Sequence, residues 1–430
     1  GGGSKLVEGF GAEVTCTGLS RIVSDPRLAA EVTEGLPTTI LANAASVLPD
    51  LTHAVDALFT PNATAKARGG PRSGGSGVLL GSVLAPEHGF RGDKQAGHGG
   101  GNATTDPRTG LRVYSIYTKT TSEIVDIVTN KAKAKVVLVD LQDAGARFYT
   151  YIWTMYDVLV ASAASGAKIK VVVLDRPNPL GGEAPDGPVL QSNFSSGVGK
   201  KPTPMKHAMT IGELALLFND EYVPLEKESG GRKAWLQVVQ MQNWERRMRF
   251  RDAGLPWVSP SPNLPTLASV SLYVGTGLVE GVNLSEGRGT TLPFELIGAA
   301  FLDWRFADRM RQLSHQDPGL SQVRFREAYY TPTFSKFANQ TCAGVQIMGD
   351  EGEADGIRVA LQLIMQAREM YPTKFAWVRS GSRFWIDLLT GSDQVRKGIE
   401  AGQTLDQIAA GWQEDLDWWK GMAQNYLLYH

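Results

Sequence analysis

The stretch AKVVLVDLQDAGARFYTYIWTMYDVLVASAASGAKIKVVVLD (Ala134–Asp175) decides the predicted fold. It opens with an apolar, β-branched run from Ala134 to Leu141, passes through a polar loop into a segment with helical spacing, Tyr151 to Ala164, and ends in a second apolar run, Ile169 to Leu174. Short continuous runs of Val, Ile and Leu separated by a helix are typical of parallel strands that are buried on both faces. The stretch therefore predicts a β–α–β unit of a parallel sheet.

The same alternation continues on both sides of this unit. Further strands are predicted at Pro37 to Leu41, Gly77 to Leu84 and Trp235 to Met241, and further helices at Ser46 to Leu58, Ser122 to Asn130 and Ile211 to Phe218. Strands that alternate with helices in this way predict an α/β fold with a doubly wound parallel sheet. After about Leu278 longer helices with fewer strands are predicted, at Pro293 to Gln312, Gly356 to Tyr371, Asp393 to Ala401 and Thr404 to Gln424, which indicates a second, smaller α/β domain.

The composition limits the partners of the chain. Among 430 residues, Lys plus Arg number 43 and Asp plus Glu number 44, so the net charge is −1 and no overall field attracts nucleic acid or anionic lipid. The run from Phe148 to Ala167 lacks Lys, Arg and Glu but contains Asp157, and it falls short of a membrane span. We expect neither nucleic acid nor a membrane as a partner, and the oligomeric state stays open.

Several features bear on the compartment. Gly1 to Ser4 lack a Met and an apolar core, as in a processed or engineered start. Five Asn-X-Ser/Thr sequons, more than composition alone explains, favour a secreted chain with N-linked glycans: Asn62, Asn102, Asn193, Asn283 and Asn339. The two cysteines, Cys16 and Cys342, form either one bridge or two buried free thiols. The Gly- and Ser-rich segment Pro61 to Gly77 is expected to be an exposed insertion.

Polar side chains follow three of the predicted strands. Glu87 lies in the segment Pro86 to Gly92 after the second strand, Asp143 lies in Gln142 to Tyr151, and Asp175 begins a third polar segment. The carboxyl ends of parallel strands meet at one edge of a sheet, where ligands bind. Asp143 and Asp175 can instead cap the helices that follow them, whereas Glu87, followed by His88, does not resemble a cap.

Other chemistries lack their motifs. No GxGxxG follows the strand that ends at Leu41, and no P-loop lysine motif or GxSxG elbow is present, which argues against nucleotide cofactors and serine hydrolysis. A metal site made of Glu87, His88, Asp93 and His98 is disfavoured because no HExxH motif supports it. We therefore expect no cofactor and no metal.

Carboxylates close to aromatic and arginine side chains match the needs of glycoside cleavage, where one carboxyl protonates the leaving oxygen and positive charge grows on the sugar. Further polar clusters occur at Lys206 to Thr210, Ser259 to Asn263 and Ser285 to Thr290. In the last of these, Gly287 and Gly289 flank Arg288, a pattern that fits either an anion-binding loop or a polar turn at the start of the second domain.

Nine ordered motifs together resemble one known family. They are LANAASV (Leu41 to Val47), PEHGFRG (Pro86 to Gly92), TGLRVYSIY (Thr109 to Tyr117), DLQDAGARFYTY (Asp140 to Tyr151), LDRPNPLGG (Leu174 to Gly182), HAMTIGELA (His207 to Ala215), SPSPNLP (Ser259 to Pro265), SEGRGTTLPFE (Ser285 to Glu295) and YLLY (Tyr426 to Tyr429). The chain resembles the exo-β-N-acetylmuramidase family of peptidoglycan glycosidases over nearly its whole length. The resemblance implies a Rossmann-like catalytic domain, which we place at residues 1–280, and a smaller C-terminal domain, residues 281–430, that closes the cleft.

The resemblance also implies a substrate and a site. Such an enzyme releases N-acetylmuramic acid from the non-reducing ends of muropeptides or disaccharides derived from peptidoglycan, and its proposed catalytic glutamate, in the PEHG motif, corresponds to Glu87 as general acid/base. We predict that Asp143 faces the same cleft as Glu87 and shares catalysis or orients the sugar. The predicted substrate-binding residues are Asn43, His88, Arg147, Tyr149, Tyr151, Arg176, Asn178, His207, Asn263, Glu286 and Arg288.

The structure of the expected sugar predicts an arginine in its binding site. N-acetylmuramic acid carries a lactyl carboxylate, which a cation can pair with, so Arg147, Arg176 and Arg288 are candidates and Arg288 is slightly favoured. Two alternatives stay open at this point. One is a non-catalytic muropeptide-binding protein in which Glu87 only hydrogen-bonds sugar hydroxyls, and the other is a β-N-acetylglucosaminidase.

Overall fold

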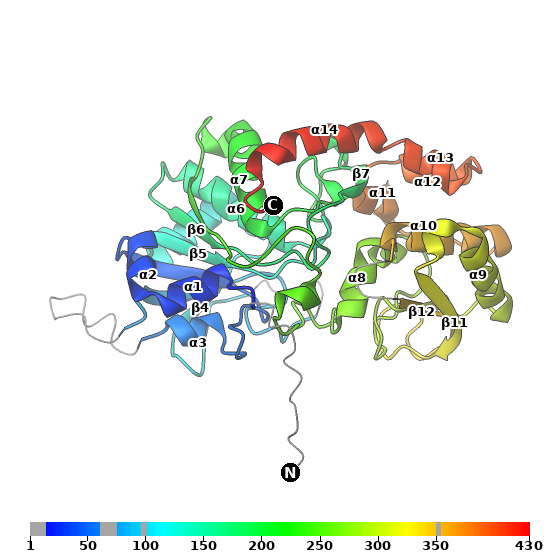
Figure 1. Cartoon of the computed structure of the whole chain (residues 1–430), viewed down its shortest axis with the longest axis horizontal. Helices are drawn as coiled ribbons and strands as arrows, with labels where there is room; N and C mark the ends of the chain where they lie inside the picture. The colour runs from blue at the N-terminus through cyan, green and yellow to red at the C-terminus, as the bar shows by residue number, and fades with distance from the viewer. Residues whose placement is uncertain (1–13, 61–74, 96–100, 350–353) are drawn as a thin grey trace, which may run out of the picture.

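A seven-stranded, mostly parallel sheet organises the first part of the molecule (Figure 1). The computed structural model describes residues 14–60, 75–95, 101–349 and 354–430. The strands lie in the order β3-β4-β2-β1-β5-β6-β9, with the bounds β1 (Pro37–Ala42), β2 (Leu79–Ala85), β3 (Thr104–Thr105), β4 (Arg112–Ser115), β5 (Val136–Asp140), β6 (Lys170–Leu174) and β9 (Trp235–Val239). Only β3 pairs antiparallel. The predicted α/β fold with a doubly wound parallel sheet is confirmed.

The strand order also predicts where a ligand binds. Numbered along the chain, the six parallel strands lie in the order 3-2-1-4-5-6, and the order reverses between β1 and β5. In such sheets the crevice lies beyond the carboxyl ends of the strands on either side of this reversal.

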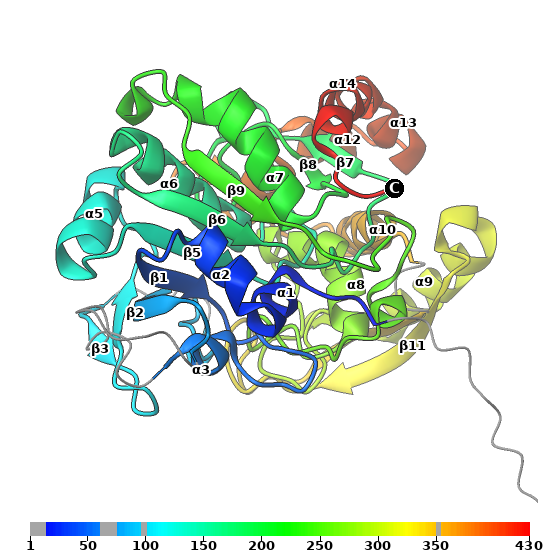
Figure 2. The ribbon, with the colours of Figure 1, turned by 60° about the vertical axis from the view of Figure 1, so that its left-hand side comes forward.

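Two layers of helices cover the sheet, one on each face (Figure 2). On one face lie α1 (Gly18–Ser24), α2 (Pro26–Val32) and α3 (Ala54–Leu58), and on the other lie α5 (Thr121–Asp126), α6 (Tyr151–Ala164) and α7 (Ile211–Leu217). Strand β5 shows why the sequence reads as continuous apolar runs. Its Val136 and Leu138 pack toward the first layer, while Val137 and Val139 pack toward the second.

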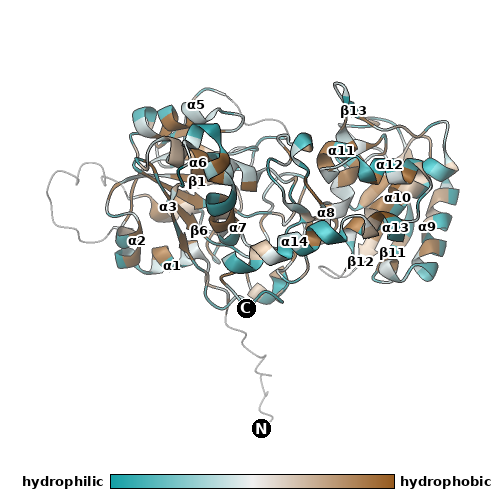
Figure 3. Cartoon of the chain, turned by 90° about the horizontal axis from the view of Figure 1, so that it is seen from above, coloured by the Kyte–Doolittle hydropathy of each residue, from teal (hydrophilic) through white to brown (hydrophobic). Residues whose placement is uncertain are grey.

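The second domain is a smaller α/β body (Figure 3). Its antiparallel sheet has the order β10-β12-β11, with bounds β10 (Leu296–Ala299), β11 (Val323–Tyr330) and β12 (Cys342–Gly349). Its helices are α8 (Leu267–Thr276), α9 (Trp304–Gln316), α10 (Gly356–Met370), α11 (Trp385–Thr390), α12 (Gln394–Glu400) and α13 (Leu405–Ala410). Two short ribbons lie outside these sheets: β7 (Asp186–Val189) with β8 (Pro204–Lys206), whose residues belong to the first domain, and β13 (Arg379–Ser380) with β14 (Arg383–Phe384).

The last helix, α14 (Gln413–Ala423), leads the chain back to the first domain (Figure 1). There the Tyr429 hydroxyl donates to Asp175 Oδ2 at 2.6 Å, and the Leu428 N–H donates to Glu213 Oε1 at 2.8 Å. The C-terminal tail therefore holds the two domains together.

Some predicted elements differ from the structure. The helix predicted at Ser46 to Leu58 forms only from Ala54, because the Ser46 hydroxyl bonds the carbonyl oxygen of Asp140 and the amide of Asn43 instead of starting a helix. The segment predicted as the helix Pro293 to Gln312 begins as β10, and α9 starts only where Asp303 accepts from the amide of Arg305.

The other differences are smaller. The helix predicted at Thr404 to Gln424 is divided into α13 and α14. Strands β4, β11 and β12 were not predicted.

The remaining expectations concern single residues. Cys16 and Cys342 are both free thiols. Asn62 and most of the predicted insertion Pro61 to Gly77 lie outside the described residues. Over the described ranges, no helix combines the length and the apolar character that a membrane span needs.

Candidate functional site

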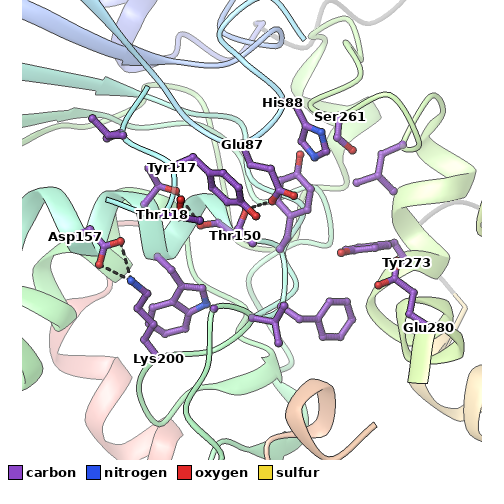
Figure 4. A pocket seen from close by; sticks show the side chains of 18 of the residues that line it. Glu87, His88, Tyr117, Thr118, Thr150, Asp157, Lys200, Ser261, Tyr273 and Glu280 are labelled. Atoms are coloured by element: carbon purple, nitrogen blue, oxygen red, sulfur yellow. Dashed lines mark hydrogen bonds and ion pairs between the residues drawn. The ribbon is translucent and has the colours of Figure 1, made fainter. Parts of the chain in front are cut away.

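A cavity of about 520 Å³ lies beyond the carboxyl ends of β2, β4 and β5, and the second domain forms its opposite wall (Figure 4). The first domain contributes Glu87, Tyr117, Thr150, Trp153, Asp157 and Lys200 to the lining, and the segments from α8 onward contribute Tyr273, Glu280, Arg288, Phe294 and Trp385. The cavity therefore lies where the strand order predicts a ligand, with polar groups at its centre and aromatic rings around them.

A tight turn after β2 directs Glu87 into the cavity. The next two residues, His88 and Gly89, both have left-handed backbone angles, with φ of 69° and 75°, and the Gly89 amide closes the turn onto the Pro86 carbonyl at 3.1 Å. A left-handed φ costs a residue with a Cβ some backbone strain, although His tolerates it better than most residues do. The strain at His88 thus accompanies the exposure of Glu87 to the cavity.

Three hydroxyl groups hold Glu87. Thr150 Oγ1 donates to Glu87 Oε2 at 2.6 Å, and Tyr151 donates to the Glu87 carbonyl oxygen at 3.1 Å and to that of Pro260 at 2.8 Å. The Tyr117 hydroxyl, which follows β4, faces the same carboxylate; burial first, then the charge and hydrogen bond of Glu87, raise the pKa of Tyr117 to about 12. Thr150 precedes α6 at the N-cap position with helical backbone angles, φ −72° and ψ −10°, and its side chain makes no capping bond.

His88 lies beside Glu87 in the lining. Its Nδ1 is 2.9 Å from the carbonyl oxygen of Lys94, which can only accept a hydrogen bond, so Nδ1 carries the proton. Burial lowers the pKa of His88, which keeps the ring neutral. Its Nε2 is then an acceptor, suited to a sugar hydroxyl or an amide N–H.

The left-hand end of the cavity in Figure 4 carries an ion pair. Lys200 Nζ lies 2.6 Å from Asp157 Oδ1 and 2.7 Å from Oδ2. Burial raises the pKa of Asp157, and the Lys200 charge opposes that shift. Aromatic side chains complete the lining, and such rings stack on the apolar faces of sugars: Tyr117, Phe148, Tyr149, Trp153, Tyr273, Phe294 and Trp385.

The opposite wall carries four charges in one cluster. Arg288 Nη2 lies 2.7 Å from Glu280 Oε1, Arg288 Nε lies 3.5 Å from Glu286 Oε1, and Lys336 Nζ lies 3.2 Å from Glu286 Oε2. The Arg288 guanidinium also stacks 5.1 Å above the Phe294 ring. Arg288 and Glu280 line the cavity, whereas Glu286 and Lys336 lie behind them.

Of the predicted site residues, Glu87, His88, Tyr149 and Arg288 line this cavity. Tyr151 lies just behind the lining and supports the Glu87 backbone. The structure therefore brings together five residues from three separate motifs.

Two predicted arginines are a correction, because neither lines the cavity. Arg147 is fully buried and donates to the carbonyl oxygens of Pro188, Thr203 and Leu389. Arg176 forms a bidentate pair with Asp140 at 2.6 and 2.8 Å. Both guanidinium groups are occupied by internal partners, so neither is placed to bind a substrate carboxylate.

The predicted amides are also corrected. Asn178 donates to the Met209 carbonyl oxygen, Asn43 donates to that of Gln142, and Asn263 donates to Gln95 Oε1. None of the three is in the cavity lining. Their bonds join the loops that follow the strands, which is a structural role.

Asp143 and His207 form a buried pair outside the lining. His207 Nε2 is 3.0 Å from Asp143 Oδ2, which also accepts from the amide of Gly145. The Met209 amide donates to His207 Nδ1, so Nε2 carries the ring proton and donates to Asp143. The predicted second catalytic carboxyl is thus placed to support the loop, and Glu286, too, lies behind the lining.

Sequence reasoning missed several residues of the lining. Tyr117 and Thr150 lie in quoted motifs beyond strand ends, a signal that could have identified them. Glu280 and Lys200 lie in segments without any such signal. Among the described residues, no three His, Cys, Asp or Glu side chains gather as a metal site requires, and His98 lies outside those residues.

The fold and the cavity define a class: a two-domain α/β protein with one carboxylate held by hydroxyl groups in an aromatic-lined cavity of the carbohydrate-binding kind. Comparison with known proteins makes this specific. The family model of the exo-β-N-acetylmuramidase NamZ N-terminal domain matches residues 38–268, and that of the C-terminal domain matches residues 271–429. The chain belongs to the exo-β-N-acetylmuramidase NamZ family.

Individual relatives agree. The chain is 41% identical over 353 residues to the peptidoglycan β-N-acetylmuramidase NamZ of Bacillus subtilis (strain 168), covering 82% of this chain and 80% of that protein. Two crystal structures of DUF1343 family proteins from Bacteroides fragilis match at TM-scores of 0.80 and 0.71, each 28% identical and covering 97% of this chain and 99% of the other.

Proposed function

We propose that this protein is an exo-acting β-N-acetylmuramidase that releases N-acetylmuramic acid from the non-reducing ends of peptidoglycan fragments. The observation that carries the proposal is Glu87, a carboxylate held at the carboxyl end of the sheet inside the aromatic cavity. Family membership supports the substrate class.

Glu87 acts in this proposal as the general acid/base. Cleavage of a glycosidic bond needs a carboxyl that gives a proton to the leaving oxygen while positive charge grows at the anomeric carbon. Thr150 fixes the orientation of the carboxylate, and the neutral His88 offers an acceptor to the sugar beside it. The tyrosine and tryptophan rings hold the sugar and exclude water.

Arg288 reads the lactyl carboxylate in the same proposal. Its guanidinium lines the cavity, and Nη1 makes no hydrogen bond to the described residues, while Nε and Nη2 both donate to Glu280. A charge-assisted pair contributes roughly 1.5–3 kcal/mol, or about ten- to a hundredfold in preference over a sugar without the carboxylate.

The test is turnover of an aryl N-acetylmuraminide by wild type and Glu87→Gln. The amide has the shape of the carboxyl but cannot transfer a proton, so we expect the rate to fall by about a hundredfold or more with the fold unchanged. Glu31→Gln, an exposed change on α2, is the matched control and should keep the wild-type rate.

Three outcomes contradict the proposal. A Glu87→Gln rate above about a tenth of wild type rejects Glu87 as the acid/base. Binding without turnover by the wild type favours a muropeptide-binding protein, and faster turnover of the matching N-acetylglucosaminide favours a glucosaminidase.

We also propose that the protein is secreted and N-glycosylated. Among the described sequons, Asn102, Asn193 and Asn339 are exposed, whereas Asn283 uses its side chain to pair with the Lys374 carbonyl oxygen and the Ala376 amide. A loss of mass on enzymatic removal of N-glycans from the naturally produced protein would support this, and an unchanged mass would contradict it.

A further inference from the structure

The charged cluster that contains Arg288 has equal numbers of positive and negative side chains before any substrate binds. It contains two cations, Arg288 and Lys336, and two carboxylates, Glu280 and Glu286, within the ion-pair distances of 2.7, 3.5 and 3.2 Å. Lys336 has no donor to spare for a ligand, because its Nζ also donates to the carbonyl oxygens of Val279, Val282 and Leu284 at 2.7 to 2.9 Å.

A bound lactyl carboxylate upsets this balance. It brings a third negative charge to a cluster with two positive charges, inside a cavity where water screens poorly. An uncompensated buried charge is strongly unfavourable. A titratable group nearby therefore takes up or loses a proton, which restores the charge balance. The group nearest to the added charge is Glu280, because it shares the Arg288 guanidinium and lines the same cavity.

We propose that Glu280 and the lactyl carboxylate of the substrate compete for Arg288, and that Glu280 takes up one proton from solvent when N-acetylmuramic acid binds. This inference rests on the proposed function. It makes Glu280 a residue that tunes specificity, because the protonated form leaves Arg288 free for the substrate, and it couples substrate affinity to pH.

The surroundings of Glu280 favour this assignment over one to Glu286. Glu280 lies on η7 (Gly277–Gly281), and 26% of its side chain is exposed, whereas the Glu286 side chain is 3% exposed and lies outside the lining. Solvent protons can therefore reach Glu280 through the cavity.

The titratable groups that face Glu280 or Arg288 act in known directions. Burial raises the pKa of Glu280, as does the Glu286 charge, while Arg288 and Lys336 oppose the shift. Tyr273 from α8 stays neutral, because burial raises its pKa well above the usual value. His88, which faces Arg288 from the β2 turn, is neutral because burial lowers its pKa. Glu87 adds a further negative charge across the cavity.

The sign of the linkage follows. Binding favours protonated Glu280, so the affinity for N-acetylmuramic acid should fall as pH rises above the pKa of free Glu280 and should level off above its pKa in the complex. Over the range in which one proton is taken up, the dissociation constant should rise by up to about tenfold per pH unit.

The test is calorimetric titration of wild type, Glu280→Gln and Arg288→Met with N-acetylmuramic acid between pH 5 and 8, in buffers of different ionisation enthalpy. Wild type should take up close to one proton within this range. Glu280→Gln should take up none, and at pH 8 it should bind at least about fivefold more tightly than wild type, the size of the repulsion between two unit charges about 4 Å apart even in bulk water. Arg288→Met should lose binding.

Two controls frame the result. N-acetylglucosamine, which lacks the lactyl carboxylate, should bind the wild type without proton uptake. Glu327→Gln, the same exchange on β11 of the second domain, should behave as wild type.

Absence of proton uptake by the wild type, or weaker binding by Glu280→Gln at every pH, would overturn the inference. The buffer series on wild type decides the matter even if Glu280→Gln does not fold. Turnover of the aryl muraminide without proton uptake would reject this inference alone and leave the proposed function standing.

Discussion

Thr150 shows how one residue can belong to a helix and to a reaction at the same time. It holds the N-cap position of α6, where threonine usually bonds a backbone amide, yet its hydroxyl donates to Glu87 Oε2 at 2.6 Å. This hydroxyl caps no backbone amide of α6, and its bond fixes the orientation of the carboxylate. Thr150 is therefore a positioning residue for Glu87.

Replacing Thr150 by valine should lower kcat on the aryl N-acetylmuraminide about ten- to a hundredfold with little change in KM. A hydrogen bond to a charged group is worth about 1.5–3 kcal/mol, and this bond acts on the reacting carboxyl rather than on the sugar.

Thr150→Ser is the conservative control, and it should recover most of the rate because it keeps the hydroxyl. A Thr150→Val enzyme with a wild-type kcat, or an equal loss in both variants, would show that Thr150 only shapes the start of α6.

For single residues, the sequence predicted the position of a side chain correctly where a strand end and a turn determine that position. Glu87 follows a strand end and precedes a turn with a glycine, and both features can be identified from the amino-acid sequence. Arg147 was wrong because its partners are three carbonyl oxygens from distant segments, and a carbonyl leaves no trace in a sequence. Glu280 was missed for a related reason, since only the packing of the second domain brings it to the cavity.

At the scale of elements, the C-terminal tail after α14 contacts the first domain through the hydroxyl of Tyr429, so removing that one hydroxyl tests what the tail contributes to stability. Tyr429 accepts from the Met241 amide at 2.9 Å and donates to Asp175 Oδ2 at 2.6 Å, so its orientation is fixed. Asp175 also accepts from Thr210 and from the amides of Arg176 and Gly212. Burial raises the pKa of Asp175 to about 6 in spite of these donors.

Tyr429→Phe should destabilise the protein by about 1.5–3 kcal/mol at pH 8 and by less at pH 5, measured as the free energy of unfolding in urea. The folded-state pKa of Asp175 lies above its unfolded value of 3.8, so the stability that this group contributes is present below about pH 4 and is lost as pH rises through about 6. Removing a donor from the ionised form deepens that loss above pH 6.

Tyr426→Phe provides the matched control, because the Tyr426 hydroxyl bonds Glu221 on the surface and should matter by less than about 0.5 kcal/mol. Equal losses for Tyr429→Phe at both pH values would show that Asp175 does not titrate in this range.

Two helices of the first domain were predicted closely. The helix at Tyr151 to Ala164 was predicted with its observed bounds although it has no side-chain cap, and the one at Ile211 to Phe218 to within a residue, where Thr210 and Glu213 form a capping box. The helix predicted from Ser46 was wrong because a tertiary bond to Asp140 outweighs local propensity. Strand β11 was missed together with its chain neighbour β12, because exposed residues such as Arg324 and Arg326 alternate with its buried ones and leave no continuous apolar run.

The whole molecule depends on how the second domain is held against the strand ends, since that contact forms the cavity. Arg147 spans this junction with no exposed surface. Its Nη1 donates to Pro188 and Thr203 in the first domain at 2.8 Å, and its Nη2 donates to Leu389 of α11 at 2.6 Å. Helix α11 begins at Trp385, which lines the cavity, so the same arginine connects domain placement to the shape of the site.

Arg147→Met should therefore affect stability and substrate binding together. Methionine fills much of the volume, but three buried carbonyl oxygens lose their donor, at about 1–3 kcal/mol each, so the free energy of unfolding should fall by at least about 3 kcal/mol. Because α11 is then held less firmly, KM for the aryl muraminide should rise more than kcat falls.

Arg147→Lys should recover only part of the stability, since an ammonium group lacks the planar fork that reaches all three acceptors. Arg305→Met, an exposed arginine of α9 paired with Asp303, should change stability by less than about 0.5 kcal/mol. A variant that loses stability but keeps the wild-type KM would mean that the domains hold their relative position without Arg147, and that the tail around Tyr429 carries that task alone.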